Sequence, residues 1–179
     1  MKILYIGGYS RSGSTLLLRL LGEQPGVVAV GELFDVWERS FSENQLCGCG
    51  KGFRQCDFWT RVTVEAFRCQ PDEVPAARFS LTRSRVQVYR RIPALWQRWL
   101  RSAAYQRELG DYAAVLEDLY VAVQKVSGSE IIVDSSKVPQ YAWVLAEARG
   151  IELHMVHLVR DSRATAFSWQ RHRIRPEIT

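Results

Sequence analysis

The chain has 179 residues, 47% of them apolar, and a formal net charge of +5 at neutral pH. This length and composition suit one globular domain with a sizeable core. No run of eighteen apolar residues exists and no signal-peptide pattern follows Lys2, so we expect no membrane span and a cytoplasmic protein. The charge alone excludes little, because an anionic ligand, nucleic acid and a membrane surface all attract a basic protein.

A glycine-rich turn near the N-terminus separates a predicted strand from a predicted helix. Residues 1–6 form a short apolar run bounded by glycines, and residues 16–21 form an apolar run without turn residues. The free N–H groups of such a turn, together with the positive end of the helix dipole, attract a phosphate or a sulfate. An ordinary strand-to-helix turn, tightened by glycine, is the alternative.

The spacing of this turn, from Gly8 to Thr15, matches the phosphate loop of nucleotide triphosphatases with one difference. Ser14 stands where those enzymes carry a lysine, and Arg11 supplies a cation three residues earlier. The sequence therefore favours a single phosphate or a phosphosulfate over a triphosphate with magnesium.

A second short strand is predicted over residues 27–30, and it leads to Gly31 and Glu32. Open α/β sheets build their sites at the carboxyl ends of parallel strands. Glu32 is therefore the carboxylate that most strongly suggests a functional site. The alternative interpretation is that Glu32 is a solvated loop residue.

Three of the four cysteines, Cys47, Cys49 and Cys56, lie within ten residues, and Cys69 follows thirteen residues later. This spacing departs from the paired pattern of four-cysteine zinc sites. A cytoplasmic location argues against a permanent disulfide. Packed or free thiols, a metal site and a redox bridge are all left open.

The middle of the chain predicts helices within an insertion of about residues 47–127. Asp57 is the predicted cap of a short amphipathic helix that runs to Cys69. Residues 83–107 predict one amphipathic helix with an arginine-rich outer face, and Asp111 predicts the cap of a second helix. The arginine face could bind an acidic acceptor, nucleic acid or anionic lipid, or it could be a solvated helix surface.

A buried strand is predicted over residues 130–134, and it would carry Lys137 to the same sheet edge as the glycine-rich turn. Ser135 or Ser136 would then cap a helix over residues 139–148.

The last predicted strand covers residues 152–159 and ends at Arg160, with Ser168 about two turns into the helix that follows. Arg160 and Ser168 could hold a phosphate from two directions. The alternative is a surface ion pair, either of Arg160 with Asp161 or of Arg163 with Asp161. Because strands and helices alternate, we expect a single three-layer α/β domain over residues 1–179 with a central parallel sheet.

Two separated motifs resemble sulfotransferases that use 3'-phosphoadenosine 5'-phosphosulfate (PAPS). Residues 9–16, Tyr-Ser-Arg-Ser-Gly-Ser-Thr-Leu, resemble the 5'-phosphosulfate-binding loop of many bacterial members and of tyrosylprotein and carbohydrate sulfotransferases. Residues 159–168 resemble the family's 3'-phosphate-binding element, an Arg-Asp pair with a serine eight residues after the arginine. The motifs occur in the family's order, so the resemblance implies a phosphate-loop-like sulfotransferase fold.

The resemblance also implies a role for each candidate residue. The 5'-phosphosulfate would be held by Arg11, Ser12, Gly13, Ser14 and Thr15, and the 3'-phosphate by Arg160 and Ser168. Glu32, twenty-one residues after Arg11, matches the general base, and Lys137 resembles a catalytic lysine that acts with Arg11 on the leaving group. PAPS would be the co-substrate, 3'-phosphoadenosine 5'-phosphate (PAP) the product, and no metal would be required.

The resemblance leaves the acceptor open beyond a hydroxyl or amine group, and it leaves the oligomeric state open. Nucleic acid is not expected as a partner. The second motif ends about ten residues before the last residue, so these residues lack the family's C-terminal segment, which closes over the nucleotide. Either the chain is a fragment, or it is a shortened member whose cofactor site is completed in another way. A non-catalytic nucleotide-binding module and a small-molecule kinase are the alternative functions.

Overall fold

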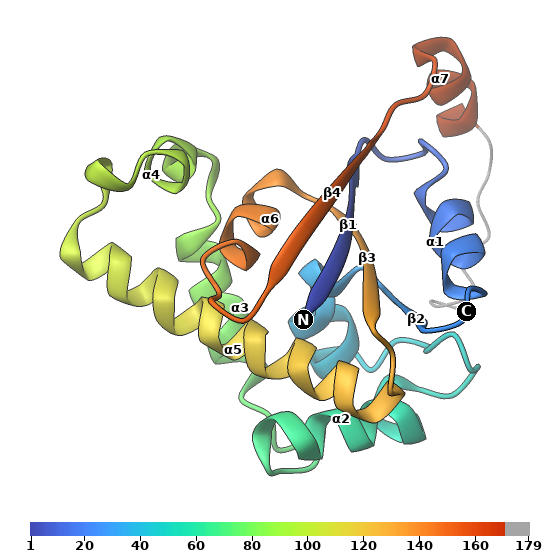
Figure 1. Ribbon diagram of the computed structural model, residues 1–179, viewed down its shortest axis with the longest axis horizontal. Helices are drawn as coiled ribbons and strands as arrows, with labels where there is room; N and C mark the ends of the chain where they lie inside the picture. The colour runs from blue at the N-terminus through green and yellow to red at the C-terminus, as the bar shows by residue number, and fades with distance from the viewer. Residues whose placement is uncertain (171–179) are drawn as a thin grey trace.

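The computed structural model describes residues 1–170, and its centre is a four-stranded parallel sheet in the order β2-β3-β1-β4 (Figure 1). The strands are β1 (Lys2–Gly8), β2 (Val27–Gly31), β3 (Ile131–Lys137) and β4 (Glu152–Leu158). Because all three pairings are parallel, the four carboxyl ends lie at one edge of the sheet. The prediction of an α/β fold with a central parallel sheet is confirmed.

Helices cover both faces of the sheet. The helix α1 (Ser14–Gly22) packs Leu18 against Ile6 and Val133 on one face. The helices α5 (Ala103–Ser127) and α6 (Pro139–Leu145) lie on the other face, as Figure 1 shows. The domain therefore has three layers, because a sheet with two apolar faces must bury both of them.

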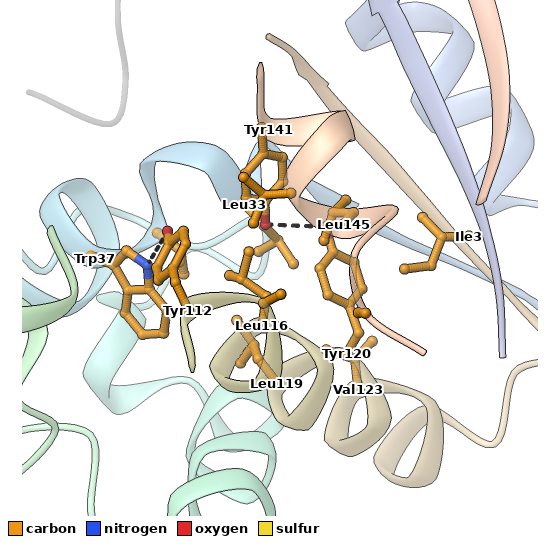
Figure 2. Packing of buried hydrophobic residues seen from close by; sticks show 14 of the residues in the cluster. Ile3, Leu33, Trp37, Tyr112, Leu116, Leu119, Tyr120, Val123, Tyr141 and Leu145 are labelled. Carbon is orange, nitrogen blue, oxygen red and sulfur yellow. Dashed lines mark hydrogen bonds between the residues drawn. The ribbon is translucent and has the colours of Figure 1, made fainter. Parts of the chain in front are cut away.

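The larger core lies on the α5 side and contains aromatic residues whose polar ends are paired (Figure 2). Trp37 Nε1 donates a hydrogen bond of 2.9 Å to the hydroxyl of Tyr112, and the hydroxyls of Tyr120 and Tyr141 are 3.3 Å apart. Because buried polar groups are costly unless they are hydrogen-bonded, these pairs let large aromatic side chains fill the core.

The helices of the insertion have different bounds from the predicted ones. Besides α5, the insertion contains the helices α2 (Asp57–Phe67), α3 (Ala76–Val86) and α4 (Ile92–Trp96). Five further helical segments complete this half of the chain, namely the π-helix η2 (Val36–Ser42) and the 3-10 helices η1 (Leu33–Asp35), η3 (Phe53–Gln55), η4 (Tyr89–Arg91) and η5 (Arg98–Leu100). The single helix predicted over residues 83–107 is wrong, because η4, α4 and η5 break that segment.

The helix cap predicted at Asp111 is also wrong, because α5 runs through this position without a break. Ser102 caps α5 and accepts the backbone N–H of Tyr105 at 3.2 Å. Leu109 and Tyr112, one residue before and two residues after Gly110, are buried on one helix face. Continuous burial of that face outweighs the low helix propensity of glycine. Asp57 is likewise the first residue of α2 rather than its cap.

Two arginines of the predicted outer face are buried in ion pairs. Arg83 in α3 has a side chain that is 11% exposed, and the side chain of Arg101 is 2% exposed. Arg101 pairs with Glu147 at 2.8 Å and donates to the carbonyl oxygens of Ala94 and Leu95. The solvated-face interpretation is therefore wrong for Arg83 and Arg101.

Among residues 1–170, none of the helices combines the length and the apolar character that a membrane crossing needs.

Candidate functional site

The predicted site residues lie along the carboxyl edge of the sheet. Glu32 follows β2, Lys137 ends β3, the glycine-rich turn follows β1, and Arg160 comes two residues after β4. In the sheet, Gly7 pairs with Lys137 and Gly8 pairs with Leu158. The strand order therefore brings segments that are distant in the sequence to one edge.

The glycine-rich turn has the backbone of an anion-binding concavity. Arg11 and Gly13 have φ angles of 70° and 101°, in the left-handed region, which turns successive N–H groups toward a common point. A Cβ atom at Gly8 would lie 2.6 Å from the carbonyl oxygen of Leu158. Only glycine allows the end of β1 to run this close to the end of β4.

Several polar groups of this turn have no partner in the described part of the chain. No side chain caps α1, and no backbone acceptor takes the N–H groups of residues 13–15. Arg11 Nε and the hydroxyl oxygen of Ser12 are buried and have no hydrogen-bond partner within residues 1–170. Buried polar groups are normally paired, so these donors fit a phosphate or a phosphosulfate.

The second predicted motif contacts the first. Arg160 Nη1 donates a 2.9 Å hydrogen bond to the carbonyl oxygen of Arg11. Arg11 Nη2 in turn donates, at 2.5 Å, to the carbonyl oxygen of Ser168 in α7 (Ser162–Gln170). Asp161 pairs with Arg163 at 3.3 Å, which is one of the two surface ion pairs that the sequence leaves open, and within residues 1–170 Arg160 forms no ion pair with Asp161.

Glu32 and Lys137 form an ion pair at the ends of β2 and β3. Lys137 Nζ contacts Glu32 Oε1 and also donates to the carbonyl oxygen of Ser135 at 2.8 Å. The lysine side chain is 14% exposed and the glutamate side chain 40% exposed. Lys137 has a φ angle of 67°, and this left-handed turn follows the irregular register between β1 and β3. A carboxylate and an ammonium are thus held beside the anion-binding turn.

The two serines after Asp134 fix the segment that carries Glu32. Ser135 Oγ donates to the carbonyl oxygen of Gly31 at 3.1 Å, and the N–H of Phe34 donates to Ser136 Oγ at 3.0 Å. The prediction that one of these serines caps α6 is therefore wrong, because Val138 precedes α6 and no side chain caps it. The serines instead tie the end of β2 to the end of β3.

Arg83 holds the same segment from the helical insertion. Its guanidinium donates to the carbonyl oxygen of Phe34 at 2.5 Å and pairs with Asp35 at 3.2 Å and Glu38 at 2.5 Å. It also lies over the ring of Phe34, 4.4 Å from the centroid. The hydrogen bond of Ser80, followed by the contacts of Arg83, lowers the pKa of Glu38. Arg83 thus joins the insertion to the residues that follow Glu32.

The sequence analysis missed the role of Asp134, a fully buried carboxylate three residues before Lys137. Its oxygens accept hydrogen bonds from the hydroxyl of Tyr120 and, at 2.6 Å, from the N–H of Ser136. Burial raises the pKa of Asp134 to about 6, although these hydrogen bonds oppose the shift. An aspartate inside an apolar strand is the sequence signal for such a network, but its tyrosine partner comes from α5 and is not indicated by spacing.

Asp134→Asn should change how stability depends on pH. The folded chain keeps a proton on Asp134 up to about pH 6, whereas an unfolded aspartate releases it near about pH 3.9. The folded state therefore binds more protons in this window, and stability falls as the pH rises through it. Between about pH 4.5 and pH 7.5 the variant should gain about 2 kcal/mol relative to the parent protein.

Urea unfolding at both pH values measures this difference. Asp118→Asn is the matched control, because Asp118 is exposed on α5. An equal pH response of the parent protein and the Asp134→Asn variant would contradict the assignment.

A cavity of about 300 Å³ adjoins Glu32. Its wall includes Leu33, Arg39, Phe53 and Trp59, so apolar, aromatic and basic side chains surround the space beside the carboxylate. Small-molecule sites have this size and this mixture of apolar walls with few polar groups. The cavity is therefore a candidate place for a second substrate.

Three cysteines form a cluster next to this cavity, and one of them, Cys47, lines it. The sulfur atoms of Cys47, Cys49 and Cys56 lie within 4.8 Å of one another, and Cys69 is not part of the group. Burial raises the pKa of Cys47 to about 11, whereas the backbone N–H of Lys51 lowers the pKa of Cys49.

Comparisons of the chain with protein-family models, with curated proteins and with solved structures found no match.

Proposed function

We propose that the protein transfers the sulfuryl group of PAPS to a hydroxyl or amine acceptor, with a phosphate-loop-like fold and a cytoplasmic location as parts of the same proposal. One observation carries it. An anion-binding turn with unmet donors lies at the same sheet edge as Arg160 and the Glu32–Lys137 pair.

The binding part of the proposal uses the two motifs that contact each other. Arg11 and the N–H groups of residues 13–15 would hold the 5'-phosphosulfate, since they combine a cation with unpaired donors. Arg160 and Ser168 would hold the 3'-phosphate. The contact of Arg160 with the Arg11 carbonyl oxygen supports this assignment, because one nucleotide must reach both motifs.

The chemical part uses the ion pair. Glu32 would take the proton of the acceptor, whose oxygen or nitrogen forms a bond to sulfur while the bond from sulfur to the bridging phosphate oxygen breaks. Lys137 and Arg11 would stabilise the charge that this oxygen gains, and one such preorganised donor contributes about 3 kcal/mol. The two substrates would replace the contact between Glu32 and Lys137, which is partly exposed to solvent.

The kinase alternative has less support. The position of the phosphate-loop lysine holds Ser14, a buried residue whose side chain carries no charge. A magnesium-bound triphosphate needs a cation at that position. ATP turnover in the presence of magnesium would favour the kinase alternative over our proposal.

The ligand preference tests the proposal. PAP should raise the melting temperature more than ADP, since a ligand at a hundredfold excess over its dissociation constant adds about 2.7 kcal/mol of stability. Arg160→Ala should abolish the preference for PAP over ADP, because it removes the cation assigned to the 3'-phosphate. Arg163→Ala is the matched control, since its guanidinium is exposed and pairs with Asp161.

Equal stabilisation by PAP and ADP, or an unchanged preference in Arg160→Ala, would contradict the binding assignment. A preference for PAP without transfer of sulfate to any acceptor would favour the non-catalytic binding module.

A further inference from the structure

The three clustered cysteines come from two sides of one ordered loop. Cys47 and Cys49 lie in the segment between η2 and η3, and Cys56 lies directly before α2. Cys56 is buried in the main core, Cys47 is half-buried and Cys49 is exposed. The cluster thus begins in the core and opens toward solvent at Cys49.

Backbone hydrogen bonds hold this loop in shape. The N–H of Cys47 donates to the carbonyl oxygen of Lys51 at 2.8 Å, and the N–H of Gly50 donates back to Cys47 at 2.9 Å. Leu46 and Gly52 form an antiparallel bridge at its base. The close approach of the thiols therefore follows from a defined backbone turn.

The Asn44 side chain fastens the second half of the loop. Its Oδ1 accepts the N–H of Arg54 at 2.8 Å, and its Nδ2 donates to the Gln55 side chain at 3.1 Å. These bonds place the residue before Cys56 against the start of the loop. The cluster is therefore preorganised by residues outside it.

We propose that Cys47, Cys49 and Cys56 bind one zinc ion as thiolates. A zinc–sulfur bond of about 2.3 Å places tetrahedral sulfur ligands about 3.8 Å apart. Sulfur atoms that lie within 4.8 Å of one another reach this spacing through small side-chain shifts. Zinc suits three soft ligands, and the exposed side of the cluster leaves its fourth position to solvent.

The site would stabilise one wall of the cavity beside Glu32, because Cys47 and Gly48 line that cavity together with Phe53. Zinc would connect this wall to Cys56 and hence to the main core. The inference does not depend on the proposed transfer of a sulfuryl group, since it rests on the thiols alone.

Metal binding is measured directly on the full chain, purified with reductant and without chelator. Zinc titration in competition with a coloured chelator should give one ion per chain. Cobalt(II) should give the intense visible bands of tetrahedral coordination and the near-ultraviolet bands of sulfur-to-cobalt charge transfer. Cys49→Ser should weaken zinc binding by more than about 100-fold, beyond the loss expected when only a supporting group is removed.

Cys69→Ser is the matched control and should bind zinc as the parent protein does. Cys49 is exposed, so its serine variant should keep the fold, and an unchanged far-ultraviolet circular dichroism spectrum checks this. Zinc should also raise the melting temperature of the parent protein and of Cys69→Ser, but not that of Cys49→Ser.

Failure of zinc to bind at one equivalent, or equal binding by Cys49→Ser, would overturn the proposal. A loss of two titratable thiols in the protein purified without reductant, with no bound metal, would also overturn it and identify a disulfide within the cluster.

Discussion

Replacing Glu32 with glutamine should lower the rate of sulfuryl transfer by about 10²- to 10⁴-fold, the usual contribution of a general base. The amide keeps the size of the side chain but cannot accept the proton of the acceptor. It also removes the counterion of Lys137, whose side chain is only 14% exposed. Release of PAP from PAPS measures the rate whatever acceptor is used, so a mixture of hydroxyl and amine compounds serves as acceptor.

Two controls separate catalysis from folding and binding in this experiment. Stabilisation by PAP should be unchanged in Glu32→Gln, because the two anion-binding motifs are intact. Glu23→Gln, at the exposed end of α1, should leave the rate unaltered. A rate in Glu32→Gln equal to that of the parent protein would show that Glu32 is not the base.

Arg83→Ala should destabilise the fold by about 3 kcal/mol, since it removes a largely buried cation that pairs with two carboxylates. Arg83 is paired with both Asp35 and Glu38 and also donates to the Phe34 carbonyl oxygen. The variant loses the donor to the Phe34 carbonyl oxygen, and it leaves Asp35 paired with Arg39 and Glu38 hydrogen-bonded to Ser80.

Urea unfolding measures the effect, and Arg85→Ala is the matched control on the same helix. Arg85 forms an exposed ion pair with Glu108 at 3.7 Å, and such a pair contributes about 1 kcal/mol or less. Equal losses of stability in the two variants would contradict the view that Arg83 fastens the insertion to the sheet.

The sheet could be predicted from the sequence because its central strands are buried. Apolar runs between turn residues mark β1, β2 and β3, and the residues that follow them fall at one edge whatever the packing of the helices. For this reason the sequence could indicate Arg11, Glu32 and Lys137 together, although it could not show the contact between Glu32 and Lys137.

The helical insertion could not be predicted in the same way, because tertiary contacts decide it. Arginine at helical spacing indicates an exposed face, yet Arg83 is buried against Asp35 and Arg101 against Glu147, and both carboxylates come from distant segments. Ser135 and Ser136 have the chemistry of helix caps, but the end of β2 offers them nearer partners. Local propensity decides neither outcome.

The strand order also sets the distance that a molecule must span to reach from the end of β2 to the end of β4. Neighbouring strands are about 4.8 Å apart, so the ends of β2 and β4 are separated by three such intervals, about 14 Å. Backbone pairing sets this distance, and insertions in the surface loops leave it intact. Only a slip in strand pairing would alter it.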